Sequence, residues 1–368
     1  MPTHAHAYVP RHRPRITTTL LPVVLAAALG LAACQAGTSA PASTAPSPPA
    51  SDAPSATAEP SATPTPEPTP VDATAAAGLT FVRFVGDREQ LFVIDPDGSA
   101  RQVGGQGEFA SVGAAQPLWS PDRSMIAFGP PTIGSGLDPQ LWVINADGTN
   151  QRPIATLGEW TDWSPDSSRL VWTDSVFTTD NTGENARIWV GDVASGEVTQ
   201  LAPRGTVTKW LPDGEHIAYT PAENPEAGIS VIPVAGGEPR HLTTGVGPWW
   251  SPDGTSFLVE RGVSIHIVSA DGSTDQLVLD RGGSPAWSPD GTKVAFVDVD
   301  EVGTFMVGIT DLDGNVLWSE VPGTDPAWSP DSTRLAVEVF DGDDTVINIL
   351  DAASGEVIWE VEGRFPDW

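Results

Sequence analysis

The sequence predicts an all-β fold, a seven-bladed β-propeller with four antiparallel strands in each blade. Three features of the 368-residue chain support this prediction. A Trp-x-Pro-Asp motif recurs about every 40 residues, an interval typical of propeller blades. A second motif, an apolar strand followed by a glycine turn, alternates with the first. The last six residues, Gly363–Trp368, match the start of one more repeat, so we expect the two ends of the chain to share a blade.

The first motif predicts a tight hairpin between the first and second strands of a blade. Pro favours the second position of a turn, Asp favours the next, and Gly adopts the left-handed conformation that follows. Three of the six turns have this glycine, and the others have Arg123, Ser167 or Ser332 there, which predicts either a strained turn or a different one. We interpret the motif tryptophans as a structural series, completed by the last residue: Trp119, Trp163, Trp210, Trp250, Trp287, Trp328 and Trp368.

The second motif predicts a hairpin between the third and fourth strands of each blade, because Asp-Gly and Gly-Gly pairs are strong hairpin signals. Seven such turns are present, at Gly98, Gly148, Gly196, Gly237, Gly272, Gly314 and Gly355. The first unit therefore lacks its innermost strand. GRFPDW at the end of the chain aligns with GTDPAW, Gly323–Trp328. We expect Gly363–Trp368 to supply the missing strand and to close the ring.

These repeats resemble the PD40 family of WD40-like β-propellers, the TolB type, and the resemblance spans the whole predicted folded region. Related propellers are attached to prolyl-oligopeptidase-type enzymes. The resemblance implies the propeller fold but no particular function, since functions sit in loops grafted on the ring. It brings no catalytic residue to this chain, because no GxSxG nucleophile elbow and no hydrolase-sized α/β segment are present.

The first 33 residues are predicted to be a lipoprotein signal peptide. Three arginines, Arg11, Arg13 and Arg15, precede an apolar run, Ile16–Leu31, which is short for a membrane-spanning helix. LAAC resembles a bacterial lipobox, which implies that Cys34, the only cysteine, becomes the lipidated first residue of the mature protein. The alternatives are an uncleaved membrane anchor and an incidental cysteine. Lipid chains would hold the protein on a membrane surface.

Residues 34–77 are predicted to be the lipidated cysteine and a disordered linker, and residues 78–368 the propeller. The linker is almost entirely Ala, Pro, Ser and Thr, which cannot form a core and favours an extended spacer. Composition leaves open whether it is O-glycosylated. The formal net charge of −30 disfavours nucleic-acid binding and favours cationic partners, and charge that serves only solubility is the favoured interpretation.

Candidate binding residues lie in the connections predicted to vary between repeats, from the second to the third strand and from one blade to the next. Variable loops on a rigid scaffold are the usual binding surface. If the acidic side chains gather at the central funnel, they would hold calcium, another divalent cation or a basic ligand; an acidic, solvated rim is the favoured alternative. The candidates are Asp174, Asp180, Glu184, Glu223, Asp298, Asp300, Asp341, Asp343 and Asp344.

Other chemically active residues give weaker signals. His216, His241 and His266 are the histidines of the folded part; convergent histidines would bind a metal, but unrelated strand positions are the favoured interpretation. The absence of cysteine there excludes a zinc–thiolate site. Two Asp-rich segments, at Asp95 and Asp311, weakly resemble calcium loops but stand where glycine turns are expected, so we predict turns.

Taken together, the sequence predicts a monomeric, non-enzymatic binding or scaffold protein without a cofactor or resident metal. It is expected outside the cytoplasm, anchored through Cys34 to the outer face of the cytoplasmic membrane, where it binds a protein, peptide or glycan of the cell envelope. One alternative is a metal-dependent polysaccharide lyase or hydrolase that uses an acidic funnel. Another is a TolB-like accessory of envelope transport.

Overall fold

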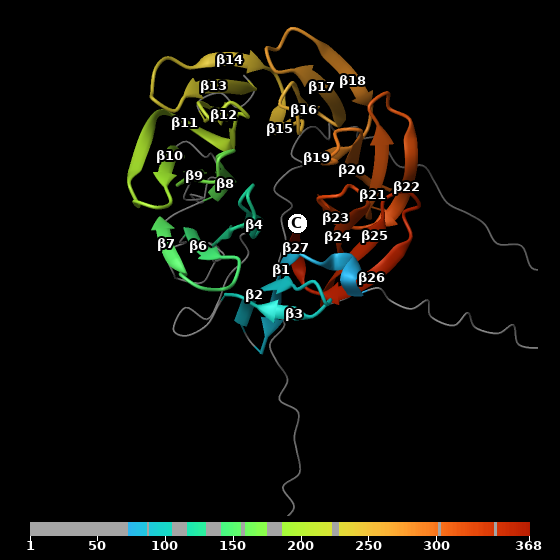
Figure 1. The fold of residues 1–368 in the computed structure, drawn as a ribbon. Coiled ribbons are helices and arrows are strands. Elements are labelled where there is room, and N and C mark those ends of the chain that lie inside the picture. The colour runs from blue at the N-terminus through green and yellow to red at the C-terminus, as the bar shows by residue number, and fades with distance from the viewer. Residues whose placement is uncertain are drawn as a thin grey trace, which may run out of the picture. The chain divides into compact units, whose positions relative to one another are not determined.

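The computed structural model describes residues 73–86, 88–104, 116–129, 141–155, 159–174, 186–222, 228–300, 303–341 and 344–368. All of them belong to the second of two compact units, residues 66–368. Their regular structure is β-sheet apart from a single 3-10 helix, η1 (Ala73–Ala76), and the sheets follow one another around a ring (Figure 1). The predicted all-β propeller fold is confirmed. No helix in these ranges has the length and apolar character needed to span a membrane.

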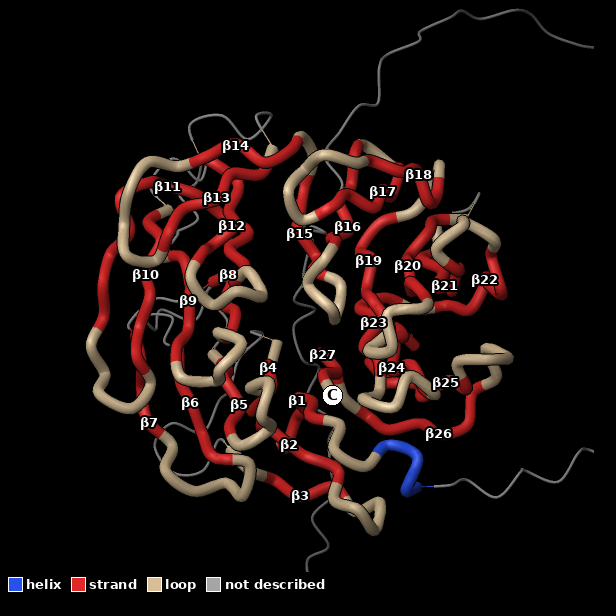
Figure 2. The backbone as a smooth tube through the Cα atoms, turned by 45° about the horizontal axis from the view of Figure 1, so that its top comes forward, coloured by secondary structure: helices blue, strands red, loops and turns tan. Residues whose placement is uncertain are grey.

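Five of the sheets have four strands (Figure 2). In order from the inner to the outer strand, they contain β27 (Arg364–Asp367), β1 (Thr80–Val85), β2 (Arg88–Ile94) and β3 (Ala100–Gln102); β4 (Leu118–Trp119), β5 (Met125–Phe128), β6 (Leu141–Asn145) and β7 (Arg152–Ala155); β15 (Val246–Trp250), β16 (Ser256–Arg261), β17 (Ser264–Ser269) and β18 (Asp275–Leu279); β19 (Gly283–Trp287), β20 (Lys293–Val299), β21 (Phe305–Asp311) and β22 (Val316–Pro322); and β23 (Thr324–Trp328), β24 (Arg334–Asp341), β25 (Asp344–Asp351) and β26 (Val357–Glu362).

The remaining described strands form one seven-stranded sheet. It contains β8 (Glu159–Trp163), β9 (Arg169–Thr173), β10 (Arg187–Asp192), β11 (Val198–Trp210), β12 (His216–Pro221), β13 (Ile229–Pro233) and β14 (Arg240–Thr243). The predicted division into seven four-stranded blades is therefore wrong in this part of the ring. Strand β11 runs through the expected boundary, pairing first with β10 and then with β12.

Gly205 explains why β11 is continuous. At the corresponding boundaries before β15 and β27, Gly245 and Gly363 have positive φ angles of 113° and 157°, and the chain turns into a new sheet. Gly205 is not among the residues with positive φ, so the chain does not turn into a new sheet at this position. A side chain at Gly205 would collide with the ring of Tyr219 on β12. This close approach of two strands requires glycine.

The predicted closure of the ring by the two ends of the described unit is confirmed. Strand β27 pairs with β1, with Thr80 opposite Asp367 and Val82 opposite Arg364, and the two strands lie side by side in Figure 1. The indole N–H of Trp368 donates to the carbonyl of Ala77 at 3.1 Å. Helix η1 adds to this junction, because Ala75 and Ala76 are buried although they precede the predicted start of the propeller at Gly78.

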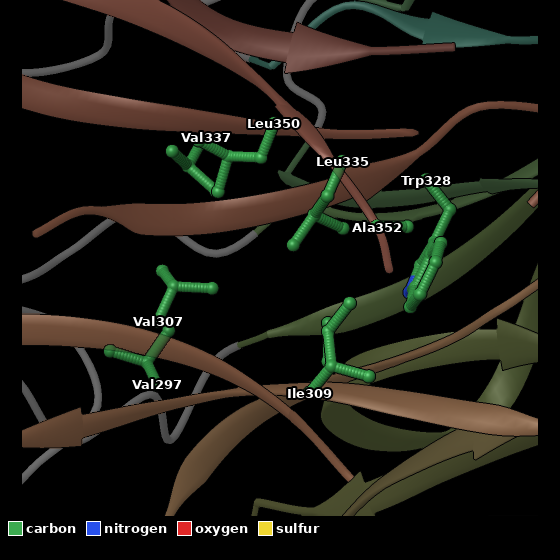
Figure 3. Close-up of a cluster of buried hydrophobic side chains, with 9 residues drawn as sticks. Val297, Val307, Ile309, Trp328, Leu335, Val337, Leu350 and Ala352 are labelled. Atoms are coloured by element: carbon green, nitrogen blue, oxygen red, sulfur yellow. The ribbon is translucent and has the colours of Figure 1, made fainter. Parts of the chain in front are cut away.

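The core lies between neighbouring sheets, because the middle strands are apolar on both faces. Figure 3 shows one such layer, where Val307 and Ile309 of β21 face Leu335 and Val337 of β24 beside Trp328. In three repeats the motif tryptophan also joins two sheets by a hydrogen bond. Its indole N–H donates to a carbonyl on the inner strand of the preceding sheet at 3.0 Å; the pairs are Trp163 with Leu118, Trp287 with Trp249, and Trp328 with Ala286.

The turns without glycine have the same backbone as the others. The φ angles are 58°, 61° and 61° for Arg123, Ser167 and Ser332. Of the two predicted alternatives, a strained turn and a different turn, the strained turn is therefore observed. Contacts with the preceding segment around the ring offset the strain. The Ser167 and Ser332 hydroxyls accept the backbone N–H groups of Asp122 and Asp290 at 3.0 and 2.9 Å. The Arg123 guanidinium donates to the carbonyl of Gly78 at 2.8 Å.

The variant Gly363→Ala is expected to destabilise the ring closure. A Cβ at Gly363 would lie 2.5 Å from Cδ2 of Phe81 and 3.0 Å from the carbonyl oxygen of Val82. Gly86→Ala is the matched control, since Gly86 also has a positive φ but an added Cβ meets nothing within 4 Å. We expect Gly363→Ala to cost roughly 1–3 kcal/mol more than the control. Urea unfolding measures both, and equal costs would show that Gly363 is not tightly packed.

Candidate binding face

Antiparallel strands place two kinds of connection on opposite faces of the ring. The Trp-x-Pro-Asp turns and the glycine turns lie on one face, which we call the turn face. The ends of the second strands, such as β1 and β24, and the starts of the third strands, such as β2 and β25, lie on the other, together with the starts of the inner strands. We call this second face the loop face. It is the surface to which the candidate acidic residues were assigned.

The described acidic candidates take part in local contacts. Asp174 is buried; its carboxylate accepts the backbone N–H of Arg187 at 2.8 Å and pairs with that residue's guanidinium at 2.5 Å. Asp298 pairs with Arg281 at 2.7 Å. Asp300 accepts the backbone N–H of Thr304 at 2.8 Å and shapes the β20–β21 turn. These carboxylates stabilise loops.

Two further candidates, Asp341 and Asp344, lie opposite each other where β24 meets β25. Asp180, Glu184, Glu223 and Asp343 lie outside the described residues, as does Cys34. Within the described ranges, no group of three or more His, Cys, Asp or Glu side chains is placed to hold a metal ion. The two Asp-rich segments form turns as predicted: Asp97 accepts the N–H of Ser99, and Asp311 accepts that of Asn315.

Two buried carboxylates that the sequence analysis missed lie between neighbouring sheets. Glu338 on β24 is 1% exposed and accepts the backbone N–H of Phe365 at 2.8 Å; Glu260 on β16 accepts that of Ser284 at 2.5 Å. Phe365 and Ser284 have positive φ angles of 55° and 47°, which turn these N–H groups away from their own sheets. Burial raises the pKa of both glutamates. The sequence feature that could have identified both residues is a glutamate ten residues after a motif tryptophan, at the end of an apolar strand.

The junction between the first and last sheets gathers more charge. Arg364 lies between Glu89 and Glu338, with N–O distances of 3.5 and 3.9 Å. The Asp367 carboxylate accepts the backbone N–H of Trp119 at 2.8 Å. Burial raises the pKa of Asp367 to about 6, although the hydrogen bond from Trp119 and the charge of Arg123 lower it. These contacts hold β27 against both of its neighbouring sheets.

The loop face also exposes large apolar side chains. Phe84 and Val85 end β1, Phe340 is near the end of β24, and Phe305 begins β21. The same face carries Val263 in the β16–β17 turn and two residues at the starts of inner strands, Trp160 and Val246. The other exposed large apolar residues of the described chain lie on outer strands: Val198, Leu277, Val316, Leu317 and Val357. The turn face is capped instead by hydrogen-bonded serine and aspartate side chains.

Comparison with known families supports the propeller interpretation. The TolB β-propeller domain model, PD40, matches residues 59–283. The chain belongs to this family. Its repeats are thus TolB-type repeats, as their Trp-x-Pro-Asp turns suggested. No protein of curated function matches the chain.

Solved structures match this TolB-type propeller at low sequence identity. TolB from Acinetobacter baumannii is 16% identical, with a TM-score of 0.49 over 79% of this chain and 82% of its own. An oligogalacturonate lyase in complex with manganese is 13% identical, with a TM-score of 0.56 over 74% and 86%. The propeller domain of Cps50 (Swd1) from Myceliophteria thermophila is 10% identical, with a TM-score of 0.50 over 68% and 88%.

One histidine of the TolB-type propeller belongs to a hydrogen-bonded chain on the sheet β15–β18. His266 Nδ1 lies 2.8 Å from a carboxylate oxygen of Asp275, and Nε2 lies 3.1 Å from the hydroxyl of Ser264. The order serine, histidine, aspartate is that of a hydrolytic triad. However, the Ser264 hydroxyl also donates to the carbonyl of Arg261 at 2.9 Å, and the Arg261 guanidinium contacts both Asp275 and His266. The cluster therefore also ties β16, β17 and β18 together.

Proposed function

We propose that this TolB-type propeller is a non-enzymatic binding module whose loop face binds a protein or peptide segment of the cell envelope. The observation that carries the proposal is the set of exposed apolar residues on that face, among which Phe84 is 53% and Phe340 51% exposed. Single exposed apolar residues are ordinary, but several on one face of a rigid scaffold are typical of interaction surfaces. The net charge of −30 favours a basic partner.

The test is co-purification from envelope extract with matched surface variants. Phe84→Ser/Phe340→Ser alters the loop face, and Val316→Ser/Leu317→Ser alters an outer strand with similar exposure. We expect one specific partner to be retained by the wild-type protein and by the outer-strand variant, and to be lost from the loop-face variant at an unchanged melting temperature. Equal recovery with both variants would contradict the proposal.

We further propose that the protein is extracytoplasmic and anchored by lipid on Cys34. The LAAC segment, the preceding apolar run and the family membership support this location. Mass spectrometry of the membrane fraction is expected to find a mature N-terminus at a diacylated Cys34. An unmodified, uncleaved chain would contradict the anchor and would leave the loop-face proposal untouched. An accessory role in envelope transport is a narrower form of the same binding function.

We propose that seven blades, not all of them separate sheets, are the functional unit of the ring. Five are the separate four-stranded sheets, and the seven-stranded sheet counts as two blades that share β11. Each half of β11 supports this count, because the first half pairs with β10 and the second with β12. Hydrogen exchange should therefore protect β11 along both halves. Rapid exchange along the whole of either half of β11 would contradict the count, because that half would not complete a blade.

A hydrolase that uses Ser264 is the second candidate function, since Ser264, His266 and Asp275 form a hydrogen-bonded chain. We expect no acylation, because the hydroxyl proton of Ser264 is shared with the carbonyl of Arg261 and Arg261 competes for Asp275. A fluorophosphonate probe, with Ser264→Ala as the control, measures this. Stoichiometric labelling that disappears in Ser264→Ala would establish the hydrolase and exclude a purely binding role.

A further inference from the structure

A cavity of about 470 Å³ lies on the turn face, between the strands β11–β14 and the sheet β15–β18. Its size falls in the range of small-ligand sites, roughly 300–1,000 Å³. It is formed by the β11–β12 turn, strand β13, the start of β14, and the β15–β16 and β17–β18 turns. It is therefore separate from the loop face, and its role does not depend on the proposed protein-binding function.

The sequence departs from the repeat at this cavity. Five of the six motif turns have serine after the tryptophan, and that serine supports the turn; Ser251, for example, donates to Asp253 at 2.7 Å and accepts the N–H of Ser256 at 3.0 Å. In the remaining turn, the third along the chain, Leu211 replaces the serine. Asp213 contacts the ring nitrogen Nδ1 of His216 at 2.7 Å instead. This exchange places an aliphatic side chain and an imidazole in the cavity lining.

Trp250 in the cavity wall differs from most of its counterparts. The indole N–H groups of Trp163, Trp287 and Trp328 donate to the preceding sheet, whereas that of Trp250, like that of Trp210, is buried and has no hydrogen-bond partner in the structure. A buried donor without an acceptor is rare in native proteins. Trp250 therefore lines the cavity without the indole hydrogen bond that five other motif tryptophans make.

The lining combines apolar surface with hydrogen-bonding groups of both kinds. Leu211, Val231 and two prolines accompany the indole of Trp250. Asp213, Glu238 and Asp271 offer carboxylate acceptors, and Arg240 and His216 offer N–H donors. Hydrogen bonds from Ser273 and Ser269 lower the pKa of Asp271 to about 2, so this carboxylate is charged at neutral pH.

We propose that this cavity binds a neutral saccharide. A sugar ring presents apolar C–H faces, which suit an indole wall, and hydroxyl groups that both donate to carboxylates and accept from Arg240 and His216. The excess of carboxylates over cationic groups disfavours uronic acids and other anionic sugars. The mixed lining, with Arg240 among the carboxylates, favours a neutral ligand over a cationic peptide side chain. The protein would then bind glycan on one face and protein on the other.

The experiment uses an array of neutral oligosaccharides, with uronic-acid oligosaccharides and a lysine-rich peptide as competing probes. The purified full chain is compared with Glu238→Gln/Arg240→Gln, which alters the exposed part of the cavity. Glu356→Gln is the matched control, because Glu356 follows a glycine turn in another repeat just as Glu238 does. Tryptophan fluorescence titration with the best neutral oligosaccharide then gives the affinity.

We expect a neutral oligosaccharide to bind, to lose at least tenfold in affinity in Glu238→Gln/Arg240→Gln, and to bind unchanged in Glu356→Gln and in the loop-face variant Phe84→Ser/Phe340→Ser. Unchanged binding in the cavity variant would overturn the site. Binding of only the uronic-acid probe or only the lysine-rich peptide would overturn the ligand class. Because the loop-face variant is included, failure of the saccharide proposal is distinguishable from failure of the proposed protein-binding function.

Discussion

Removal of Gly363–Trp368 is expected to unfold the ring at a much lower temperature than the full chain. The deletion takes away strand β27, which pairs with β1, and the hydrogen bonds of Trp368 with Ala77 and of Asp367 with Trp119. Loss of a large packed aromatic residue alone costs about 3–5 kcal/mol. For a domain of this size we expect the melting temperature to fall by about 10 °C or more.

The control for this deletion is Trp368→Phe, which keeps β27 and an aromatic ring but removes the indole hydrogen bond to Ala77. It should lose a small part of the stability lost by the deletion. Differential scanning calorimetry measures all three proteins. A deleted chain that melts at the temperature of the full chain would show that β27 does not close the ring.

The second large effect concerns pH and Asp367. The pKa of this carboxyl is raised from 3.8 to about 6 in the folded protein, first by burial. The folded state therefore binds a proton more tightly than the unfolded state, and the contribution of Asp367 to stability falls as the pH rises from about 4 to about 6. Above that range the charged carboxylate lowers the free energy of unfolding. Because the side chain keeps some contact with solvent, we expect a cost of about 1–2 kcal/mol.

Asp367→Asn removes the charge and keeps an oxygen that accepts the N–H of Trp119. The variant should be more stable than wild type by about 1–2 kcal/mol at pH 7.5, and the difference should vanish below pH 4. Urea unfolding at the two pH values measures it. Aspartates of the turns titrate alike in both proteins, so their contributions to the stability difference cancel. In Asp166, for example, hydrogen bonds from Ser164 and Ser168 lower the pKa to about 2. A stability difference that does not change with pH would contradict the role of Asp367.

The sequence was sufficient for those parts of the fold that depend on local rules. Proline, aspartate and glycine in fixed order define a turn within four residues, so the hairpins could be predicted one by one. The closure by Gly363–Trp368 followed from alignment of the repeats. The continuity of β11 could not be predicted, because it depends on the φ angle of Gly205 and its distance from Tyr219, a residue on a different strand.

The candidate site was less predictable for a similar reason. Asp174 looked like a free loop carboxylate, but its partner, Arg187, is 13 residues away in the sequence. Glu260 and Glu338 looked like ordinary strand residues. Their role depends on residues of the next sheet that have a left-handed backbone conformation, because this conformation points their N–H groups at the two glutamates. The sequence was sufficient to show that the predicted loops are rich in acidic residues. The apolar residues of the loop face became informative only when the strand order placed Phe84, Phe305 and Phe340 on one side.

Site-specific photo-crosslinking in intact cells tests the central claim, that the loop face is the binding surface. A benzophenone amino acid replaces Phe340 on the loop face in one protein and Leu317 on an outer strand in another; the two residues are similarly exposed, at 51% and 49%. We predict a covalent adduct with one envelope protein from position 340 and none from position 317. Adducts of equal yield from both positions, or an adduct from position 317 alone, would contradict the account.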